Sequence, residues 1–236
     1  EAYKYYLEAK YIYDKRENMK DTEIARGLLR KAIELDDNLL IAKNMLAKTY
    51  FETGDYDKAM EVYTSTLKQA EEIGDKDIQG RLLNNIGMLY ADKGDLDTAS
   101  DYYERSLKIV EEIGDKAGIA ASFNNIGNVY SRKDDLDIAS DYYERSLKIV
   151  EEIGDKAGIA ARFNNIGGIY HEQGDLGRAL GYYESSLAIK EEIGDKYGMI
   201  SSLWNIWLIY SNKGDSVKAS DYYESWFKIK KELSNP

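Results

Sequence analysis

The chain has 236 residues, with 43 acidic and 32 basic side chains, a formal net charge of -11 and no cysteine. Because binding to phosphate backbones needs clustered cations, the charge argues against nucleic acid as a partner. The lack of cysteine excludes disulfides and thiolate metal sites, and no apolar run approaches the roughly 18 residues of a membrane span. We expect no cofactor, no metal and no membrane span. We also expect a cytoplasmic location, although the lack of cysteine does not by itself determine the compartment. Since the chain begins at Glu1 rather than Met, we expect a fragment or a processed product.

In chain order, the predicted elements are six pairs of helices, and we assign the whole of 1–236 to a single domain. The approximate repeats are 1–37, 38–75, 76–115, 116–155, 156–195 and 196–236. The first unit matches the others less well. A second helix in that unit is indicated by Ile24, Ala25, Leu29 and Ala32.

A shift of 40 residues aligns the chain with itself. The clearest copies are LLNNIGMLYADKGDLDTASDYYERSL at 82–107 and SFNNIGNVYSRKDDLDIASDYYERSL at 122–147. Related copies occupy 42–67, 162–187 and 202–227. Residues 99–121 are identical to residues 139–161. This identity indicates a recent duplication or deliberate engineering, and the sequence does not separate the two.

A period near 40 alone also fits HEAT or armadillo helices and propeller blades. The spacing within a unit is more specific, because apolar residues recur three and four positions apart, as in Leu83, Ile86, Leu89 and Tyr90. Such spacing predicts amphipathic helices, and the lack of two-residue alternation argues against blades. Gly94-Asp95 is expected to separate the helices of one unit, and 113–116 to separate that unit from the next.

Each central unit carries a Gly, a Tyr, an Ala and an aromatic residue at fixed spacing. The sets are Gly87, Tyr90, Ala99 and Tyr103, then Gly127, Tyr130, Ala139 and Tyr143, then Gly167, Tyr170, Ala179 and Tyr183. Over about residues 20 to 234 this pattern resembles the tetratricopeptide repeat family. The resemblance implies an all-α fold, a right-handed α-α superhelix of six helix-turn-helix repeats with about twelve helices. Small Gly and Ala residues would let the two helices of a unit approach, and we expect the tyrosines to fill the layer between units.

The units from Leu40 onward are longer than the 34-residue form. They resemble the arrays of Pins-like adaptors, kinesin light chains and bacterial signalling proteins in which such arrays precede a histidine kinase or cyclase. The wording IGDKxGIAxxxNNIGxxY is most similar to the bacterial group. The chain contains no effector domain of that kind.

The family resemblance implies that the first helix of each unit lines a groove that takes up peptides or helices. Three residues before the Gly position stand Asn44, Asn84, Asn124, Asn164 and Trp204. Asn has both a donor and an acceptor, so it is able to grip a peptide unit bidentately. With helices about 8–10 Å apart and a peptide advancing about 3.3 Å per residue, each asparagine would contact roughly one in three peptide residues. We call this row of first-series asparagines, one per repeat, the asparagine ladder. Duplication of a repeat that contained an incidental asparagine would give the same row.

The next position on the first helix reads Met45, Asn85, Asn125, Asn165 and Asn205, and we interpret it as structural. Further groove candidates are Lys48, Asn128, Arg132 and His171. These positions vary while the scaffold repeats, which is typical of a specificity surface and equally of drift at exposed sites. A carboxylate clamp like that of chaperone-binding members is not expected, because Asn124 replaces its first Lys, and Ser201 and Asn205 occupy its last two cationic positions.

The last unit departs from the pattern. Trp207 replaces the packing Gly, and Trp226 replaces the small residue Ser106, Ser146 or Ser186 of earlier copies. Together with Trp204 and Phe227 this gives four large aromatic residues in one terminal unit. We interpret them as an end cap, or as packing on a following helix, since a solenoid must cover its terminal apolar face. The alternative is a partner interface or a homodimer through the C-terminal end.

No catalytic residue is predicted. His171 is the single histidine, and the Gly-Asp-Lys triplets lack the spacing of a phosphate loop. The pairs of acidic residues recur from repeat to repeat at helix ends, and we interpret them as solvent-exposed faces. We therefore expect a protein-protein interaction scaffold, not an enzyme, that binds a peptide or helix of an unidentified partner in its groove. The alternatives are a structural, self-associating or engineered repeat module, or the sensory region of a bacterial signalling protein.

Overall fold

The computed structural model of the chain describes residues 1–16 and 18–234. Within these residues it contains twelve α-helices and no β-strand, which confirms the predicted all-α class and the six helix-turn-helix pairs. The chain divides by its internal packing into two compact units, Glu1–Gly118 and Ile119–Pro236. The single proline, Pro236, lies outside the described residues.

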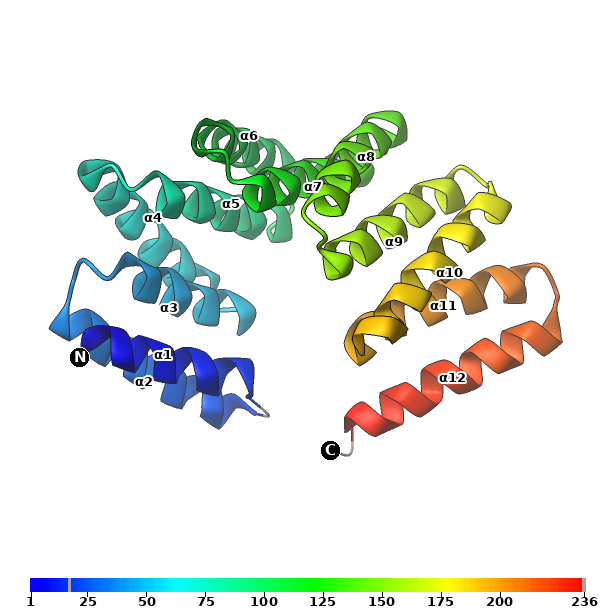
Figure 1. The fold of residues 1–236 in the computed structure, drawn as a ribbon, viewed down its shortest axis with the longest axis horizontal. Helices are drawn as coiled ribbons and strands as arrows, with labels where there is room; N and C mark the ends of the chain where they lie inside the picture. The colour runs from blue at the N-terminus through cyan, green and yellow to red at the C-terminus, as the bar shows by residue number, and fades with distance from the viewer. Residues whose placement is uncertain (17, 235–236) are drawn as a thin grey trace. The chain divides into compact units, whose positions relative to one another are not determined.

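The first unit holds three consecutive helix pairs (Figure 1). Its helices are α1 (Ala2–Asp14), α2 (Met19–Leu35), α3 (Leu40–Glu52), α4 (Tyr56–Ile73), α5 (Lys76–Asp92) and α6 (Leu96–Ile113). Each helix packs on the one before it in the chain, and α5 also packs on α3, the first helix of the preceding pair. Successive pairs therefore lie against each other, and their first helices are neighbours.

The second unit begins within the first turn of α7. Its helices are α7 (Lys116–Arg132), α8 (Leu136–Glu152), α9 (Lys156–Glu172), α10 (Leu176–Ile193), α11 (Lys196–Asn212) and α12 (Ser216–Ser234). Each helix from α9 onward packs on the one before it. Buried residues recur at three-residue spacing, as in Leu203, Ile206 and Ile209 of α11. Full burial of such a side chain stabilises the fold by about 1.5–3 kcal/mol, so these rows hold the stack together.

The predicted helix boundaries lie at the Gly-Asp pairs. Helix α5 ends at Asp92, α6 begins at Leu96, and the Asp95 side chain accepts a hydrogen bond from the Thr98 N–H at 3.1 Å. Gly94 has a φ of 85°, a left-handed conformation that favours glycine. One period later the equivalent residue is Asp134, which adopts a φ of 66°. Asp is one of the few residues that tolerate this conformation at modest cost, so the turn is kept.

The invariant spacing of Gly and Tyr reflects a close approach of the two helices in a pair. A Cβ atom on Gly127 would lie 2.7 Å from Cε1 of Tyr143 and 3.3 Å from the carbonyl oxygen of Ala139. Gly87 meets Tyr103 in the same way. Glycine leaves an open strip of backbone wide enough for an aromatic ring. The ring of Tyr143 also belongs to one core cluster with Ile166 and Ile169 of the next repeat, so it fills the layer between units as expected.

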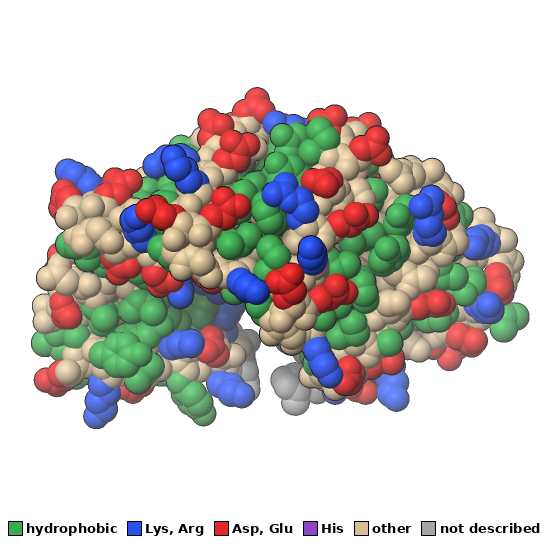
Figure 2. Space-filling model, turned by 45° about the horizontal axis from the view of Figure 1, so that its top comes forward, with side chains coloured by type: hydrophobic (Ala, Val, Ile, Leu, Met, Phe, Trp, Pro, Cys, Tyr) green, Lys and Arg blue, Asp and Glu red, His purple; other side chains and the backbone are tan. Residues whose placement is uncertain are grey.

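Charged side chains of both signs cover the outside of the helices. Figure 2 shows acidic and basic side chains interspersed over the face that it presents. Two exposed ion pairs link the helices of one repeat, Lys156 with Glu192 at 2.5 Å and Lys196 with Glu232 at 2.8 Å. Exposed pairs of this kind contribute at most about 1 kcal/mol, so the apolar rows and not the charges carry the stability.

We predict that Gly127→Ala destabilises the protein. Overpacking against the Tyr143 ring costs about 1–3 kcal/mol, which exceeds the gain of roughly 1 kcal/mol in helix propensity. The matched control is Gly181→Ala in α10, where nothing lies within 4 Å of the added methyl group, so propensity alone acts and the protein becomes more stable. Thermal unfolding followed by circular dichroism measures both. Equal shifts for the two variants would show that the Gly-Tyr contact is not close-packed.

Candidate peptide-binding surface

The two asparagine series join successive first helices by side-chain hydrogen bonds. In the first unit, Nδ2 of Asn85 on α5 donates to Oδ1 of Asn44 on α3 at 2.9 Å. In the second unit, Nδ2 of Asn165 on α9 donates to Oδ1 of Asn124 on α7, also at 2.9 Å. Each bond therefore connects the second series of one repeat to the first series of the repeat before it.

The last step of this ladder is looser. Nδ2 of Asn205 on α11 lies 3.4 Å from Oδ1 of Asn164, and the Ser202 hydroxyl lies at the same distance from that oxygen. Trp204 occupies the first-series position in this repeat, so the first series of asparagines ends at Asn164.

Among the first-series asparagines of the second unit, Nδ2 of Asn124 donates to Oδ1 of Asn125 at 3.3 Å, whereas Asn164 differs. Within the described part of the chain, every buried side-chain nitrogen and oxygen has a hydrogen-bond partner. Nδ2 of Asn164 makes no hydrogen bond among those residues, and the residue is half-buried, so this nitrogen reaches solvent. Its Oδ1 already accepts from the next repeat. The sequence suggested a bidentate grip on a peptide unit, whereas this arrangement presents chiefly an N–H donor.

The remaining predicted residues of the first unit lie near this ladder. Lys48 is exposed on α3, and its Nζ lies 3.6 Å from a carboxylate oxygen of Glu52 one turn later. Asn84 is half-buried on α5, with Nδ2 3.8 Å from the sulfur of Met88. Both helices therefore offer polar groups on the side that carries Asn44.

In the second unit, one predicted residue is held by the fold itself. The hydroxyl of Tyr143 on α8 donates to Oδ1 of Asn128 at 2.7 Å. Burial raises the pKa of Tyr143 to about 12, so this hydroxyl keeps its proton at neutral pH. Arg132 is exposed at the end of α7, and His171 is half-buried in the last turn of α9. Asn124, Asn128 and Arg132 thus follow one another along the first helix of this repeat.

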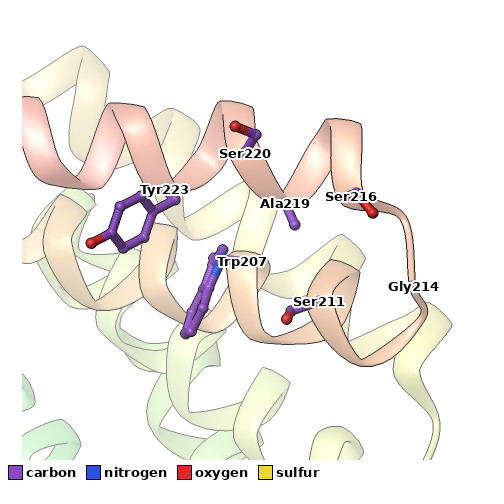
Figure 3. A pocket seen from close by; sticks show the side chains of 7 residues that line it. All are labelled: Trp207, Ser211, Gly214, Ser216, Ala219, Ser220 and Tyr223. Atoms are coloured by element: carbon purple, nitrogen blue, oxygen red, sulfur yellow. The ribbon is translucent and has the colours of Figure 1, made fainter.

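Trp204 belongs to a different cluster from the asparagines. Its ring centroid lies 4.3 Å from that of Trp207 and 5.3 Å from that of Trp226 on α12. Phe227 is exposed and stacks on Tyr223 at 6.4 Å. Figure 3 shows Trp207 of α11 and Tyr223 of α12, which both line a cavity of about 450 Å³. Trp207 stands at the position of the packing glycine, and Tyr223 is 43% exposed whereas its counterpart Tyr183 is buried.

Buried serines connect the repeats behind this surface. Ser186 of α10 donates to the carbonyl oxygen of Ala160 at 2.7 Å, and its Oγ lies 3.1 Å from Oγ of Ser202 in the next repeat. Ser146 donates to the Ala120 carbonyl oxygen in the same way and accepts from Nε of Arg162. Each of these two serines therefore contacts the next repeat and also makes a hydrogen bond inside its own repeat.

Sequence reasoning missed a buried lysine in this network. Lys190 is only 5% exposed, and its Nζ donates to Oγ of Ser202 at 2.9 Å. Burial lowers the pKa of Lys190, and the Asp195 carboxylate opposes this shift. The signal was available, because Val110 and Val150 stand at this position in two earlier repeats. A charged residue at a position where the other repeats have an apolar core residue indicates a local change in the packing between repeats.

The described residues contain no cluster of three or more His, Cys, Asp or Glu side chains arranged to hold a metal ion. None of their helices combines the length and the hydrophobicity that crossing a bilayer requires.

A model of the tetratricopeptide repeat family matches residues 38–112, 78–152 and 118–192, which together cover about two thirds of the chain. No curated protein sequence matches this chain. Among solved structures, BtubC (BKLC) from P. vanneervenii is similar with 24% identity and a TM-score of 0.74, over 92% of this chain and 91% of that one.

Two further structures are similar over nearly all of this chain. The signal transduction ATPase PH0952 from Pyrococcus horikoshii, which has a tetratricopeptide repeat sensor, shares 20% identity with a TM-score of 0.76, over 93% of this chain and 34% of that one. Aspartyl phosphate phosphatase F from Bacillus subtilis shares 18% identity with a TM-score of 0.72, over 97% of this chain and 59% of that one. The chain thus spans about a third and about three fifths of these proteins, and at such identities the likeness is one of fold.

We predict that Lys190→Met stabilises the protein by about 1 kcal/mol at pH 7, because an apolar chain of similar length avoids the desolvation of a buried cation. The folded-state pKa lies below the unfolded one, so the unfolded chain binds more protons between the two values and the parent gains stability as pH rises through that window. The advantage of the variant should therefore shrink toward alkaline pH.

Urea unfolding at pH 7 and at alkaline pH measures this difference. Lys228→Met on the exposed side of α12 is the control and should change little. A Lys190→Met variant that is less stable than the parent at pH 7 would show that the serine contacts outweigh desolvation.

Proposed function

Because this chain belongs to the tetratricopeptide repeat family, we propose that it is a non-enzymatic scaffold that binds a segment of another protein on the exposed side of its first helices. The solved structures with this fold include a signal transduction ATPase with a tetratricopeptide repeat sensor and an aspartyl phosphate phosphatase. A role as the sensory or adaptor part of a signalling protein is the biological setting that these likenesses favour.

The observation that carries the proposal is the N–H donor of Asn164. Nδ2 of Asn164 reaches solvent while its Oδ1 accepts a hydrogen bond from the next repeat. Asn124 is held by the next repeat in the same way, so the amide groups of the two residues lie one repeat apart on side chains whose rotamers are already restricted. Pre-ordered donors lose little entropy on binding, which suits recognition of peptide carbonyl oxygens irrespective of side chain. Exposed Arg132, beside Asn128, would favour an acidic side chain in the partner.

The second unit offers the sharper test, because it has two consecutive steps of the ladder. The partner is expected to be an extended or helical peptide lying over α7 and α9, with its backbone carbonyl oxygens facing Asn124 and Asn164. Lys48, Asn44 and Asn84 would serve the same purpose in the first unit. His171, at the end of α9, would contact a side chain at the edge of the bound segment.

We predict that Asn124→Ala/Asn164→Ala weakens peptide binding, while Asn165→Ala/Asn205→Ala retains it. Both double variants break the same two asparagine bonds between helices. Only the first removes the first-series side chains, and with Asn164 it also removes the acceptor of the Ser202 hydroxyl. Peptides are first selected from a random display library with the parent protein. Their affinities for the three proteins are then compared by fluorescence anisotropy, after circular dichroism has shown equal helicity.

Two lost hydrogen bonds of about 0.5–1.5 kcal/mol each correspond to affinity weaker by roughly fivefold to 150-fold. If the two double variants bind the selected peptides equally, the asparagine ladder is a structural feature and not a recognition device. If the library yields no binding peptide, the proposed peptide site is wrong.

A further inference from the structure

The last repeat leaves uncovered the positions that every earlier repeat of the second unit buries. In α10, Tyr183, Ser186 and Lys190 are at most 5% exposed, because α11 of the next repeat lies over them. One period later the same positions on α12 are Tyr223, Trp226 and Lys230, and no described helix lies over them. Tyr223 is 43% exposed as a result. The surface that α11 and α12 present here is therefore one half of the contact between repeats.

This C-terminal end face is hollowed and aromatic. We define it by Tyr197, Trp204, Trp207, Tyr223, Trp226 and Phe227. Three cavities of about 450, 520 and 390 Å³ lie along it. The first and third share Tyr223, and the second and third share Trp226 and Lys230, so the cavities adjoin one another along this face. The apolar walls of these cavities suit the binding of a helix better than they suit the surface of an end cap.

The first helix of the chain also has an exposed apolar side. On α1, Tyr6, Ala9 and Tyr13 are buried in the core of the first unit. Tyr3, Leu7 and Tyr11, spaced four residues apart along another side of the helix, are 56%, 48% and 68% exposed. In later repeats the first helix is covered by the preceding repeat, as α5 is by α3. No described residue covers the α1 stripe in that way.

Exposed large hydrophobic residues gather in these two repeats. Besides the junction isoleucines, such as Ile73 and Ile113, the described residues of the four central repeats contribute only Met88 and Ile138. Contiguous exposed apolar surface of this kind marks an interaction site.

We propose that the C-terminal end face binds the first repeat of a second copy of this chain, head to tail. In this arrangement α1 of the incoming copy takes the place on α11 and α12 that α11 takes on α9 and α10. The occupant follows from continuity, because the end face continues the repeat-to-repeat contact and the α1 stripe is its uncovered counterpart in the same chain. Such a contact is heterologous, so each added copy leaves one free face of each kind.

Two single-ended variants and their mixture test the proposal. Leu7→Glu/Tyr11→Glu alters the α1 stripe, and Tyr197→Glu/Phe227→Glu alters the end face. All four side chains are at least 48% exposed, so both variants are expected to fold. The matched control is Ile73→Glu/Ile138→Glu, which changes two exposed apolar residues to glutamate outside the terminal repeats. Sedimentation velocity over a range of concentrations gives the masses, and circular dichroism checks the helicity of each variant.

We expect the mass of the parent and of the control to rise with concentration beyond that of a dimer. Each single-ended variant alone should stay monomeric. Their equimolar mixture should form a heterodimer and stop there, because one variant supplies an intact end face and the other an intact α1 stripe.

Two results would overturn the proposal. If the α1 variant still self-associates while the end-face variant does not, the end face pairs with itself in an isologous dimer. If the parent remains monomeric at all concentrations, the end face does not take a second copy.

Discussion

A pair of helices in this chain cannot bury its own outer apolar side, and only the next pair covers it. This constraint decides which residues each position holds. Where a following repeat exists, small or buried residues such as Ser186 and Tyr183 fit beneath its first helix. Where no described repeat follows, the same positions carry Trp226 and an exposed Tyr223. Stability, the asparagine bonds and the exposed ends all derive from this dependence of each pair on its neighbour.

The polar face has the same origin. First helices lie next to each other because each pair packs on the one before it, and this places Asn165 within 2.9 Å of Asn124. The bond fixes the first-series side chain in one rotamer, so the frame that holds the repeats together also orients the groups offered to a partner. The oxygen of Asn164 thus joins two repeats while its nitrogen reaches solvent, so one side chain has a structural role and the role in recognition that we propose.

The helices and their ends could be predicted from the sequence, because apolar spacing and Gly-Asp pairs act locally, as at Gly94 and Asp95. The structural role of the second asparagine series was inferred, but its partner was not, since that depends on the register between helices 40 residues apart. The same limit concealed the contact of Lys190 with Ser202 and the packing of Trp204 on Trp226. Comparison of one repeat with the next identifies such residues as exceptions to the pattern. Only the three-dimensional structure shows which residues they contact.

The repeated hydrogen bonds have a consequence for how the gene is able to change. Residues 99–121 and 139–161 are identical, so unequal recombination within this stretch adds or removes one whole period and rejoins the reading frame at the same residue. Each asparagine donor then meets an acceptor of the same type, and each buried serine again finds a backbone carbonyl group. The number of repeats, and with it the length of the surface, is thus free to evolve in single steps without an intermediate that fails to fold.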